Sequence, residues 1–362
     1  MDNRPKIVLT GGGTAGHVIP NLALLPSLFA EGWEAEYIGS ACGIEKRLVE
    51  AKGLPFHSIA SGKLRRYFDL KNFTDPFRVL LGGLQAWSLL GRIKPNVVFS
   101  KGGFVAVPVV VAARLRGIPV IIHESDLTPG LANRLTIPCA RIVCASFPET
   151  LKHLPAEKGV VTGAPIRIEL FTGVREKGET FLRLPPSQDP AILKPLLLVM
   201  GGSLGSRILN QAVRLILPEL LTRFRVAHIC GQGGLDSTVE ATPGYRQFEF
   251  ISSEISDVLA ASDFILSRAG SNAIFEFLSL QKPHLLVPLS RAASRGDQIL
   301  NAEAFAARGY SSVLPEENLG GGRLLKELDA LRANGDQYVQ AMRFSPIRNG
   351  TEQVMDQIRK FA

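Results

Sequence analysis

Short apolar runs rich in Val, Ile and Leu recur along the chain, and a segment long enough for a helix follows most of them. Continuous apolar runs, unlike alternating ones, are typical of strands that are buried on both faces of a sheet. The runs predicted as strands are Ile7–Gly11, Ala35–Ser40, Val97–Ser100, Pro119–Glu124, Arg141–Ser146, Gly159–Gly163, Leu196–Gly201, Val226–Gly231, Phe248–Ser252, Asp263–Gly270, His284–Leu289 and Ser311–Leu314. Strands that alternate with helices predict parallel sheets covered on both faces, and hence an α/β fold.

This series of strands and helices is interrupted once. The stretch Arg183–Pro195 is irregular, with Pro-Pro and Asp-Pro steps, and a second series begins at Leu196. A chain of 362 residues also exceeds one usual core. We therefore expect two Rossmann-like domains with parallel sheets facing across a cleft. We assign residues 1–166 and 167–340 to them, and expect a helix in 341–362 to pack back on the first.

Ligands of such folds bind in the loops that follow the carboxyl ends of strands. Three of these loops are rich in glycine: Gly11–His17, Ser100–Phe104 and Gly201–Arg207. Glycine lets backbone N–H groups approach an anion, and the N-terminus of the following helix adds its dipole. The first loop formally fits a dinucleotide fingerprint, but the second predicted strand does not end on the acidic residue that this would need. Each loop is also compatible with a tight turn that binds nothing.

Several polar side chains next to these loops have chemistry of their own. His17 stands at a helix start, where it could take a proton from a hydroxyl or merely bind a phosphate. Glu276 lies one turn into a predicted helix, where a carboxylate could accept both hydroxyls of a ribose or simply face water. The amide and carboxylate groups of Arg295–Ala302 suit a sugar, or the polar start of an exposed helix.

Composition and charge narrow the class of protein. There are 41 Lys and Arg against 33 Asp and Glu, which gives a net charge of +8. A basic balance suits anionic partners, although it can also serve only solubility. No interleaving of aromatic and basic residues of an RNA-binding kind is present, so we expect no nucleic acid.

The sequence also bears on location and on metals. The longest stretch without charge, Ile7–Ala30, is broken by glycine, proline and histidine, so we expect no spanning helix. No signal peptide is recognisable. The four cysteines form no metal-ligand spacing, so reduced thiols in the cytosol are expected. No pair of carboxylates has metal spacing either, and we predict no obligatory metal and no cofactor.

One segment could contact a membrane. Phe73, Phe77, Leu80 and Leu84 recur at helical spacing, and basic residues accompany them: Lys63, Arg65, Arg66, Lys71 and Arg78. An apolar stripe edged by cations suits the surface of an anionic membrane. The alternative is an amphipathic helix whose stripe faces the core.

The order of the motifs resembles one family. Gly11–His17 in the first half, followed by Gly201–Ser203, Ser267–Glu276 and Asp297–Ala302 in the second, is similar to the MurG family of GT-B-type N-acetylglucosaminyltransferases. His123-Glu124 and Gly163–Arg167 match as well. The resemblance runs from about Lys6 to Ala304, and this many motifs in the right order are highly specific.

The resemblance implies an inverting transfer of GlcNAc from UDP-GlcNAc to the MurNAc 4-hydroxyl of lipid I, which makes lipid II for peptidoglycan. It places the enzyme peripherally on the cytoplasmic face of the plasma membrane, with a cell-wall synthesis complex as a further partner. The first domain would hold the acceptor and the membrane, and the second the donor.

The family's site residues can be carried over by position. The base would be His17, or Glu124 acting through it. The donor would be bound by Thr14, Ala15, Gly16, Asp126, Arg167, Ser203, Ile251, Ser271, Asn272, Ala273, Ile274, Phe275, Glu276 and Gln298. The acceptor diphosphate would be bound by Gly13, Gly102 and Gly103, and the membrane by Phe73, Phe77 and Leu80. The chain departs from the family pattern at Asp126, Ser271-Asn272 and Asp297, which affects details of donor binding more than the reaction.

Other interpretations are compatible with the same motifs. Another GT-B enzyme, such as a diacylglycerol glycosyltransferase or a UDP-sugar 2-epimerase, would share much of the pattern. An epimerase would need further acid and base residues and no lipid-facing stripe. A protein that binds a UDP-sugar without turnover is the alternative outside enzymes.

Overall fold

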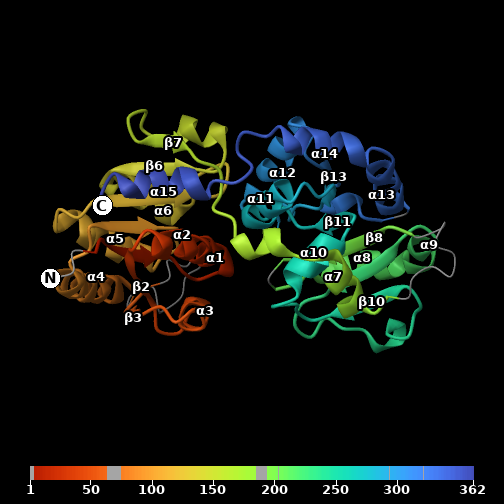
Figure 1. The fold of residues 1–362 in the computed structure, drawn as a ribbon, viewed down its shortest axis with the longest axis horizontal. Helices are drawn as coiled ribbons and strands as arrows, with labels where there is room; N and C mark the ends of the chain where they lie inside the picture. Colours follow the sequence, from red (N-terminus) through yellow and green to blue (C-terminus); the bar gives the residue numbers. More distant parts are fainter. Residues whose placement is uncertain (1–3, 63–74, 185–193, 203, 293, 321) are drawn as a thin grey trace. The chain divides into compact units, whose positions relative to one another are not determined.

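The computed structural model describes residues 4–62, 75–184, 194–202, 204–292, 294–320 and 322–362. The chain divides into two compact units (Figure 1). The N-terminal unit comprises Met1–Arg167 and Asn349–Ala362, and the C-terminal unit comprises Ile168–Arg348.

The N-terminal unit is built on a parallel sheet. Its described strands are β1 (Lys6–Thr10), β2 (Glu34–Ser40), β3 (Phe56–Ile59), β4 (Val97–Ser100), β5 (Val120–Glu124), β6 (Ile142–Ala145) and β7 (Gly159–Val161). They lie in the order β3-β2-β1-β4-β5-β6-β7. The order reverses between β1 and β4, and in open parallel sheets the loops at such a switch point form the ligand site.

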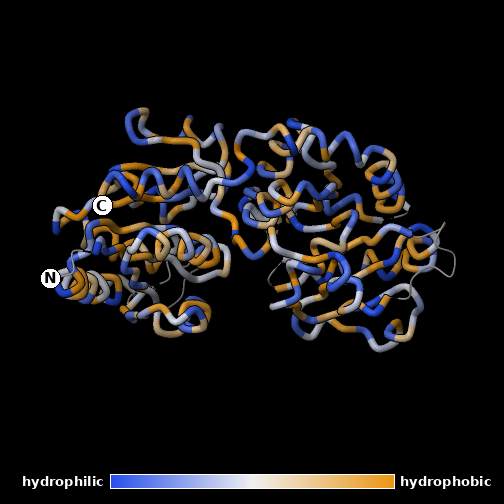
Figure 2. The backbone as a smooth tube through the Cα atoms, viewed as in Figure 1, coloured by the Kyte–Doolittle hydropathy of each residue, from blue (hydrophilic) through white to orange (hydrophobic). Residues whose placement is uncertain are grey.

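Helices cover both faces of this sheet. They are α1 (Ile19–Ala23), α2 (Leu25–Ala30), α3 (Ile44–Glu50), α4 (Asp75–Ile93), α5 (Ala106–Leu115), α6 (Leu131–Thr136) and α15 (Thr351–Arg359). Successive strand residues point to opposite faces: Ile7 and Leu9 pack in one core cluster, and Val8 packs in the other. Strand β6, labelled in Figure 1, is mostly orange in Figure 2, as expected for a strand buried on both sides.

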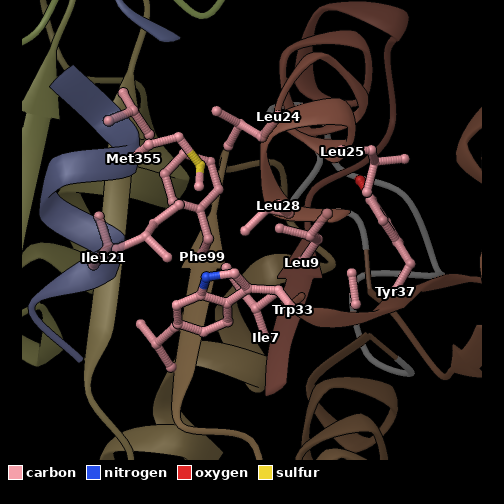
Figure 3. Packing of buried hydrophobic residues seen from close by; sticks show 14 of the residues in the cluster. Ile7, Leu9, Leu24, Leu25, Leu28, Trp33, Tyr37, Phe99, Ile121 and Met355 are labelled. Carbon is pink, nitrogen blue, oxygen red and sulfur yellow. The ribbon is translucent and has the colours of Figure 1, made fainter. Parts of the chain in front are cut away.

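The last helix of the chain completes the first of these clusters. Met355 of α15 points toward Phe99 and Ile121 of the sheet (Figure 3), and Val354 and Ile358 belong to the same cluster. The C-terminus therefore lies on the unit that the N-terminus begins (Figure 1).

The C-terminal unit repeats the plan with a second parallel sheet. Its described strands are β8 (Leu196–Met200), β9 (Arg225–Ile229), β10 (Tyr245–Phe248), β11 (Phe264–Ser267), β12 (His284–Leu286) and β13 (Ser312–Val313), in the order β10-β9-β8-β11-β12-β13. Its helices are α7 (Arg175–Leu182), α8 (Arg207–Leu215), α9 (Leu217–Leu221), α10 (Ile255–Ala261), α11 (Ser271–Ser279), α12 (Asp297–Ala307), α13 (Arg323–Ala333) and α14 (Gly335–Arg343).

The prediction of an α/β fold with two parallel sheets is confirmed. The predicted strands differ from the observed ones at β3 and β10. Strand β3 was not predicted, because this edge strand has only four residues and includes His57 and Ser58. The strand expected at Phe248–Ser252 lies instead at Tyr245–Phe248. There only Tyr245 is fully buried, so the edge strand β10 lacks the continuous apolar run that identifies central strands.

Candidate active site

Two glycine loops lie side by side at the switch point of the N-terminal sheet. They follow β1 and β4, which are paired in parallel, so both loops leave the same edge. The backbone N–H of Gly12 donates to the carbonyl of Gly102 over 3.3 Å. Gly103 has φ +84°, and a Cβ there would lie 2.3 Å from the Gly12 carbonyl oxygen. Only glycine fits this contact, so the two loops form a single surface of backbone.

A buried carboxylate supports the first loop from below. Glu45, at the start of α3, is fully buried. It accepts the backbone N–H of Gly13 over 3.2 Å and that of Ser40 over 3.1 Å. The Tyr37 hydroxyl donates to the Gly11 carbonyl over 2.7 Å. These contacts fix the loop in one conformation.

The imidazole of His17 is held in one tautomer. Its Nδ1 lies 3.0 Å from the carbonyl oxygen of Gly12 and 3.2 Å from the Thr14 hydroxyl. A carbonyl can only accept, so Nδ1 carries the proton and Nε2 has the lone pair. Burial, and after it the charge of Lys101, lowers the pKa of His17 below its usual 6.5. The neutral imidazole is therefore a base already in place.

Glu124 is occupied by its own loop. Its carboxylate accepts the backbone N–H groups of Asp126 and Gly130, each over 3.0 Å, and the amide of Asn133 over 2.8 Å. Burial and the nearby Asp126 raise its pKa. The three hydrogen bonds fix the segment between β5 and α6, which positions Asp126 beside the glycine loops.

A lysine and a histidine lie beneath the same loops. The Lys101 side chain, 2% exposed, donates from Nζ to His123 Nδ1 over 2.7 Å and to the Ser125 hydroxyl. His123 Nε2 lies 2.9 Å from the Gly163 carbonyl, so Nε2 carries the proton and Nδ1 accepts. Burial lowers the pKa of Lys101 to about 8, although Glu124 and Asp126 oppose the shift.

The glycine loop of the C-terminal unit links β8 to α8. Ser206 caps α8, since its hydroxyl accepts the N–H of Leu209 over 3.3 Å. Arg268 donates to that hydroxyl over 2.6 Å and also forms an ion pair with Glu316. These contacts connect the loop to the segment that follows β13. Ser203, predicted to hold the donor diphosphate, lies outside the described residues.

Helix α11 begins directly after Gly270, which ends the short loop that follows β11. Ser271, Asn272, Ala273 and Glu276 are half-buried, whereas the side chains of Ile274 and Phe275 are fully buried. The Phe275 ring packs edge-on against Phe305 at 5.3 Å. Ile274 and Phe275 can therefore meet a ligand only through their backbone.

The remaining candidates differ in exposure. Ile251 is buried after β10, and Arg167 is the half-buried last residue before the C-terminal unit. The Gln298 Oε1 accepts the backbone N–H of Leu289 over 3.2 Å, which orients its amide. Near His17, Thr14 and Gly13 are exposed, Ala15, Gly16, Asp126 and Gly103 half-buried, and Gly102 buried.

An apolar stripe runs along the outer face of α4. Five of its side chains are exposed: Phe77 by 74%, Leu80 by 64%, Leu81 by 49%, Leu84 by 62% and Trp87 by 41%. The opposite face of the helix contributes Ala86, Leu90 and Ile93 to the core. The stripe is therefore not the core-facing side of the helix. Phe73 and the basic residues Lys63, Arg65, Arg66 and Lys71 lie outside the described residues, while Arg78 is described and exposed.

The described residues bear on metal binding and on membrane insertion. Among the residues that the structure describes, no group of three or more His, Cys, Asp or Glu side chains could hold a metal ion. Within the same residues, no helix has the length and apolar character to cross a membrane.

Two residues that build the site were not singled out from the sequence. In the sequence, Lys101 is only one residue of the glycine motif Ser100–Phe104. Glu45 follows the second predicted strand, but no motif in the sequence marks it. Its contact with Gly13 joins positions 32 apart in the chain, and only the fold reveals it.

Comparison with known proteins agrees with this arrangement. The model of the glycosyltransferase family 28 N-terminal domain matches residues 7–144, and that of the C-terminal domain matches residues 196–358. The crystal structure of Acinetobacter baumannii MurG superposes with a TM-score of 0.75 at 26% identity, covering 98% of this chain and 99% of that one. Fold and site thus define a GT-B glycosyltransferase of family 28.

The sequence relatives are more specific. A UDP-N-acetylglucosamine--N-acetylmuramyl-(pentapeptide) pyrophosphoryl-undecaprenol N-acetylglucosamine transferase from Clostridium tetani is 52% identical, over 99% of this chain and 98% of its own length. The protein of the same name from Lachnoclostridium phytofermentans is 54% identical over 98% of both chains. The chain belongs to this family of transferases, which is the MurG family predicted from the sequence.

Proposed function

We propose that this enzyme transfers GlcNAc from UDP-GlcNAc to the 4-hydroxyl of the MurNAc residue of lipid I, giving lipid II for peptidoglycan synthesis. The relatives carry this reaction in their names, at more than half identity over nearly the whole chain. The observation that carries the chemistry is the His17 imidazole, neutral and with its Nε2 lone pair available, at the edge of the paired glycine loops.

His17 acts as the general base in this proposal. An inverting transfer needs a group that takes the proton of the acceptor hydroxyl while that oxygen attacks the anomeric carbon of the donor. A base with a pKa somewhat below the working pH is already unprotonated, and it becomes cationic only as the proton arrives. Glu124 contributes by fixing the loop of Asp126, since its own carboxylate is fully engaged there.

The C-terminal unit binds the donor. The backbone N–H groups at the start of α11, from Ser271 to Ala273, lie at the positive end of the helix dipole and can bind the diphosphate, as can the loop at Ser203. Glu276, one turn later, accepts the ribose hydroxyls, and Ile251 contacts the uracil. Gln298 offers its oriented amide to the sugar. Arg167, which belongs to the N-terminal unit, adds a cation in this proposal. These donors stabilise the UDP leaving group as charge develops on it.

The N-terminal unit binds the acceptor. The backbone N–H groups of Gly13, Gly102 and Gly103 bind its diphosphate, while Thr14, Ala15 and Gly16 line the position of the transferred sugar. This assignment rests on the joined glycine loops and on their fixed conformation.

The α4 stripe binds the membrane. This helix has five exposed apolar side chains, and the exposed cation Arg78 lies next to them. Such a surface suits an anionic bilayer, where a lipid-linked acceptor is held. We therefore place the enzyme peripherally on the cytoplasmic face of the plasma membrane, where a cell-wall synthesis complex would be its partner.

A transferase assay tests the proposal. Purified enzyme is given UDP-GlcNAc and a short-chain lipid I analogue, and UDP release and the disaccharide product are measured. UDP-glucose and UDP-GalNAc serve as alternative donors, and diacylglycerol as an alternative acceptor. Transfer that requires the lipid I analogue and prefers UDP-GlcNAc supports the assignment. Equal turnover with diacylglycerol, or epimerisation of UDP-GlcNAc without acceptor, would overturn it.

A further inference from the structure

Lys101 is a buried cation that the proposed mechanism does not use. It follows β4 directly, and its backbone N–H donates to the Thr10 carbonyl over 2.9 Å, at the base of the first glycine loop. A Cβ added at Gly11 would lie 3.2 Å from the Lys101 Cβ. The side chain thus leaves the chain at the point where the two glycine loops meet.

The hydrogen-bond partners of this ammonium are neutral. One is the bare Nδ1 of His123, whose pKa burial and the Lys101 charge itself hold well below 6.5. The other is the Ser125 hydroxyl. A buried cation whose contacts are neutral keeps its field, because no directly bonded carboxylate cancels it.

Ionisable groups on the surrounding elements act on this charge from further away. Glu124 at the end of β5, Asp126 after it and the Cys144 thiol of β6 favour the charged form of Lys101. Burial raises the pKa of Cys144 to about 12, so this thiol stays neutral. His17 also feels the charge, since Lys101 lowers its pKa while Asp126 and Glu45 raise it.

We propose that Lys101 is a positioning residue whose buried ammonium supplies a fixed positive charge beneath the paired glycine loops, so that the loops bind a diphosphate and His17 stays an unprotonated base. The inference rests on the proposed acceptor site and adds to it the source of its charge. Backbone N–H groups orient an anion, and a cation in a low dielectric strengthens its binding.

The test compares Lys101→Met with Lys282→Met. Lys282 is a matched control, because it is a half-buried lysine whose pKa is also lowered to about 8, but it bonds to the carbonyls of Ala260 and Ser262 in the C-terminal unit. Inorganic pyrophosphate is titrated into each protein by calorimetry. We expect Lys101→Met to weaken its affinity on the order of tenfold, with UDP affinity within twofold of wild type. Lys282→Met should leave pyrophosphate affinity unchanged.

The pH dependence gives a second readout, which a merely structural role would not move. Removing the cation raises the pKa of His17, so the acid limb of kcat/KM shifts to higher pH in Lys101→Met. The imidazole resonance of His17 can be assigned with His17→Gln. The pH midpoint of its titration should also move to higher pH in Lys101→Met, and this measurement needs no turnover.

Wild-type protein alone also tests the inference, should Lys101→Met fail to fold. Its pyrophosphate affinity should fall as pH rises through about 8, where Lys101 loses its proton. Pyrophosphate itself gains negative charge over this range, so the ligand cannot cause the decrease. Affinity that is flat or rising through pH 8, or equal losses in the two Met variants, would overturn the role of Lys101. Because pyrophosphate binding needs no turnover, a failure of the transferase reaction is a separate result.

Discussion

At the scale of single residues, the site depends on which atoms are already occupied. The Nδ1 of His17 donates to the Gly12 carbonyl, so the lone pair lies on Nε2, whereas both oxygens of Glu124 accept hydrogen bonds from its own loop. The two residues are both candidates for the general base; these hydrogen bonds are the reason why we propose His17 for that role and Glu124 as a support for its loop. The same argument assigns Glu45 to the support of Gly13.

The first prediction concerns His17. We expect His17→Ala to lower kcat by roughly 10²–10⁴-fold with little change in donor KM, because a base acts mainly in the transition state. The wild-type acid limb should lie below pH 6.5: the pKa is lowered, so the neutral base persists until the pH falls through that lower value. Steady-state kinetics between pH 5 and 8 measure the kcat of His17→Ala and the acid limb of the wild-type enzyme. A kcat near that of wild type would reduce His17 to a loop residue.

The second prediction concerns Glu276. Glu276→Ala should raise the KM for UDP-GlcNAc by about tenfold to a hundredfold, since charge-assisted hydrogen bonds contribute roughly 1.5–3 kcal/mol each. The acceptor KM should change much less. Glu303→Ala on α12 is a control for the loss of a carboxylate from a helix of the same unit. If donor KM stays constant in a folded Glu276→Ala protein, Glu276 does not bind the ribose.

At the scale of elements, α4 combines two opposite faces. Ala86, Leu90 and Ile93 hold it to the core, whereas Phe77, Leu80 and Leu84 are mostly exposed. Gly82 lies so close to the Ala60 carbonyl that a Cβ would reach 2.0 Å, which fixes the helix against β3. The exposed stripe therefore cannot turn inward without losing this packing.

The third prediction follows from that rigidity. Changing Phe77, Leu80 and Leu84 together to Ser should weaken the affinity of the protein for anionic liposomes by about a hundredfold or more. The reason is that each apolar side chain contributes roughly 1.5–3 kcal/mol when fully buried. Residual binding should be strongly salt-sensitive, because only the electrostatic part remains. Liposome sedimentation measures both, and activity on a soluble acceptor should persist.

A matched triple variant controls this experiment. Leu215, Leu235 and Phe344 are exposed apolar residues of the C-terminal unit, and their change to Ser removes similar surface elsewhere. It should leave liposome binding intact. A fall in melting temperature of the α4 variant, with activity on soluble and membrane acceptors lost together, would mean that the stripe serves folding instead.

At the scale of the whole molecule, each unit contains a core of its own, and the chain enters the N-terminal unit twice. Helix α15 buries Val354, Met355 and Ile358 against β1, β4 and β5, although some 180 residues of the other unit precede it. Thr351 also accepts the N–H of Ile166 over 3.1 Å, which joins the two passages of the chain. The end of the chain is thus part of the unit that carries His17.

The fourth prediction tests that assignment. Met355→Ala should destabilise the N-terminal unit by about 2–5 kcal/mol, because it leaves a cavity next to Phe99. Calorimetry should show a lower unfolding transition. At a temperature where the variant is folded, UDP affinity should match wild type, because we place the UDP site in the other unit. A parallel loss of UDP affinity would contradict this division of roles.

The sequence by itself determined the α/β class, the central strands and the family. Central strands such as β1, β4 and β8 are buried on both faces, so their apolar runs are continuous and visible without the fold, whereas the short edge strand β3 was missed and β10 was misplaced. The glycine loops were visible too, because a close backbone approach requires glycine wherever it occurs. Their functional roles in this chain remain predictions.

Only the tertiary structure decided how the side chains are used. That His17 has a bound Nδ1, that Glu45 reaches Gly13, and that Lys101 lies buried on His123 are contacts between positions distant in the chain or fixed by loop conformation. The exposure of the α4 stripe is likewise a property of the packed helix. An amphipathic pattern gives the presence of an apolar face, but which face meets the core depends on the elements packed against it.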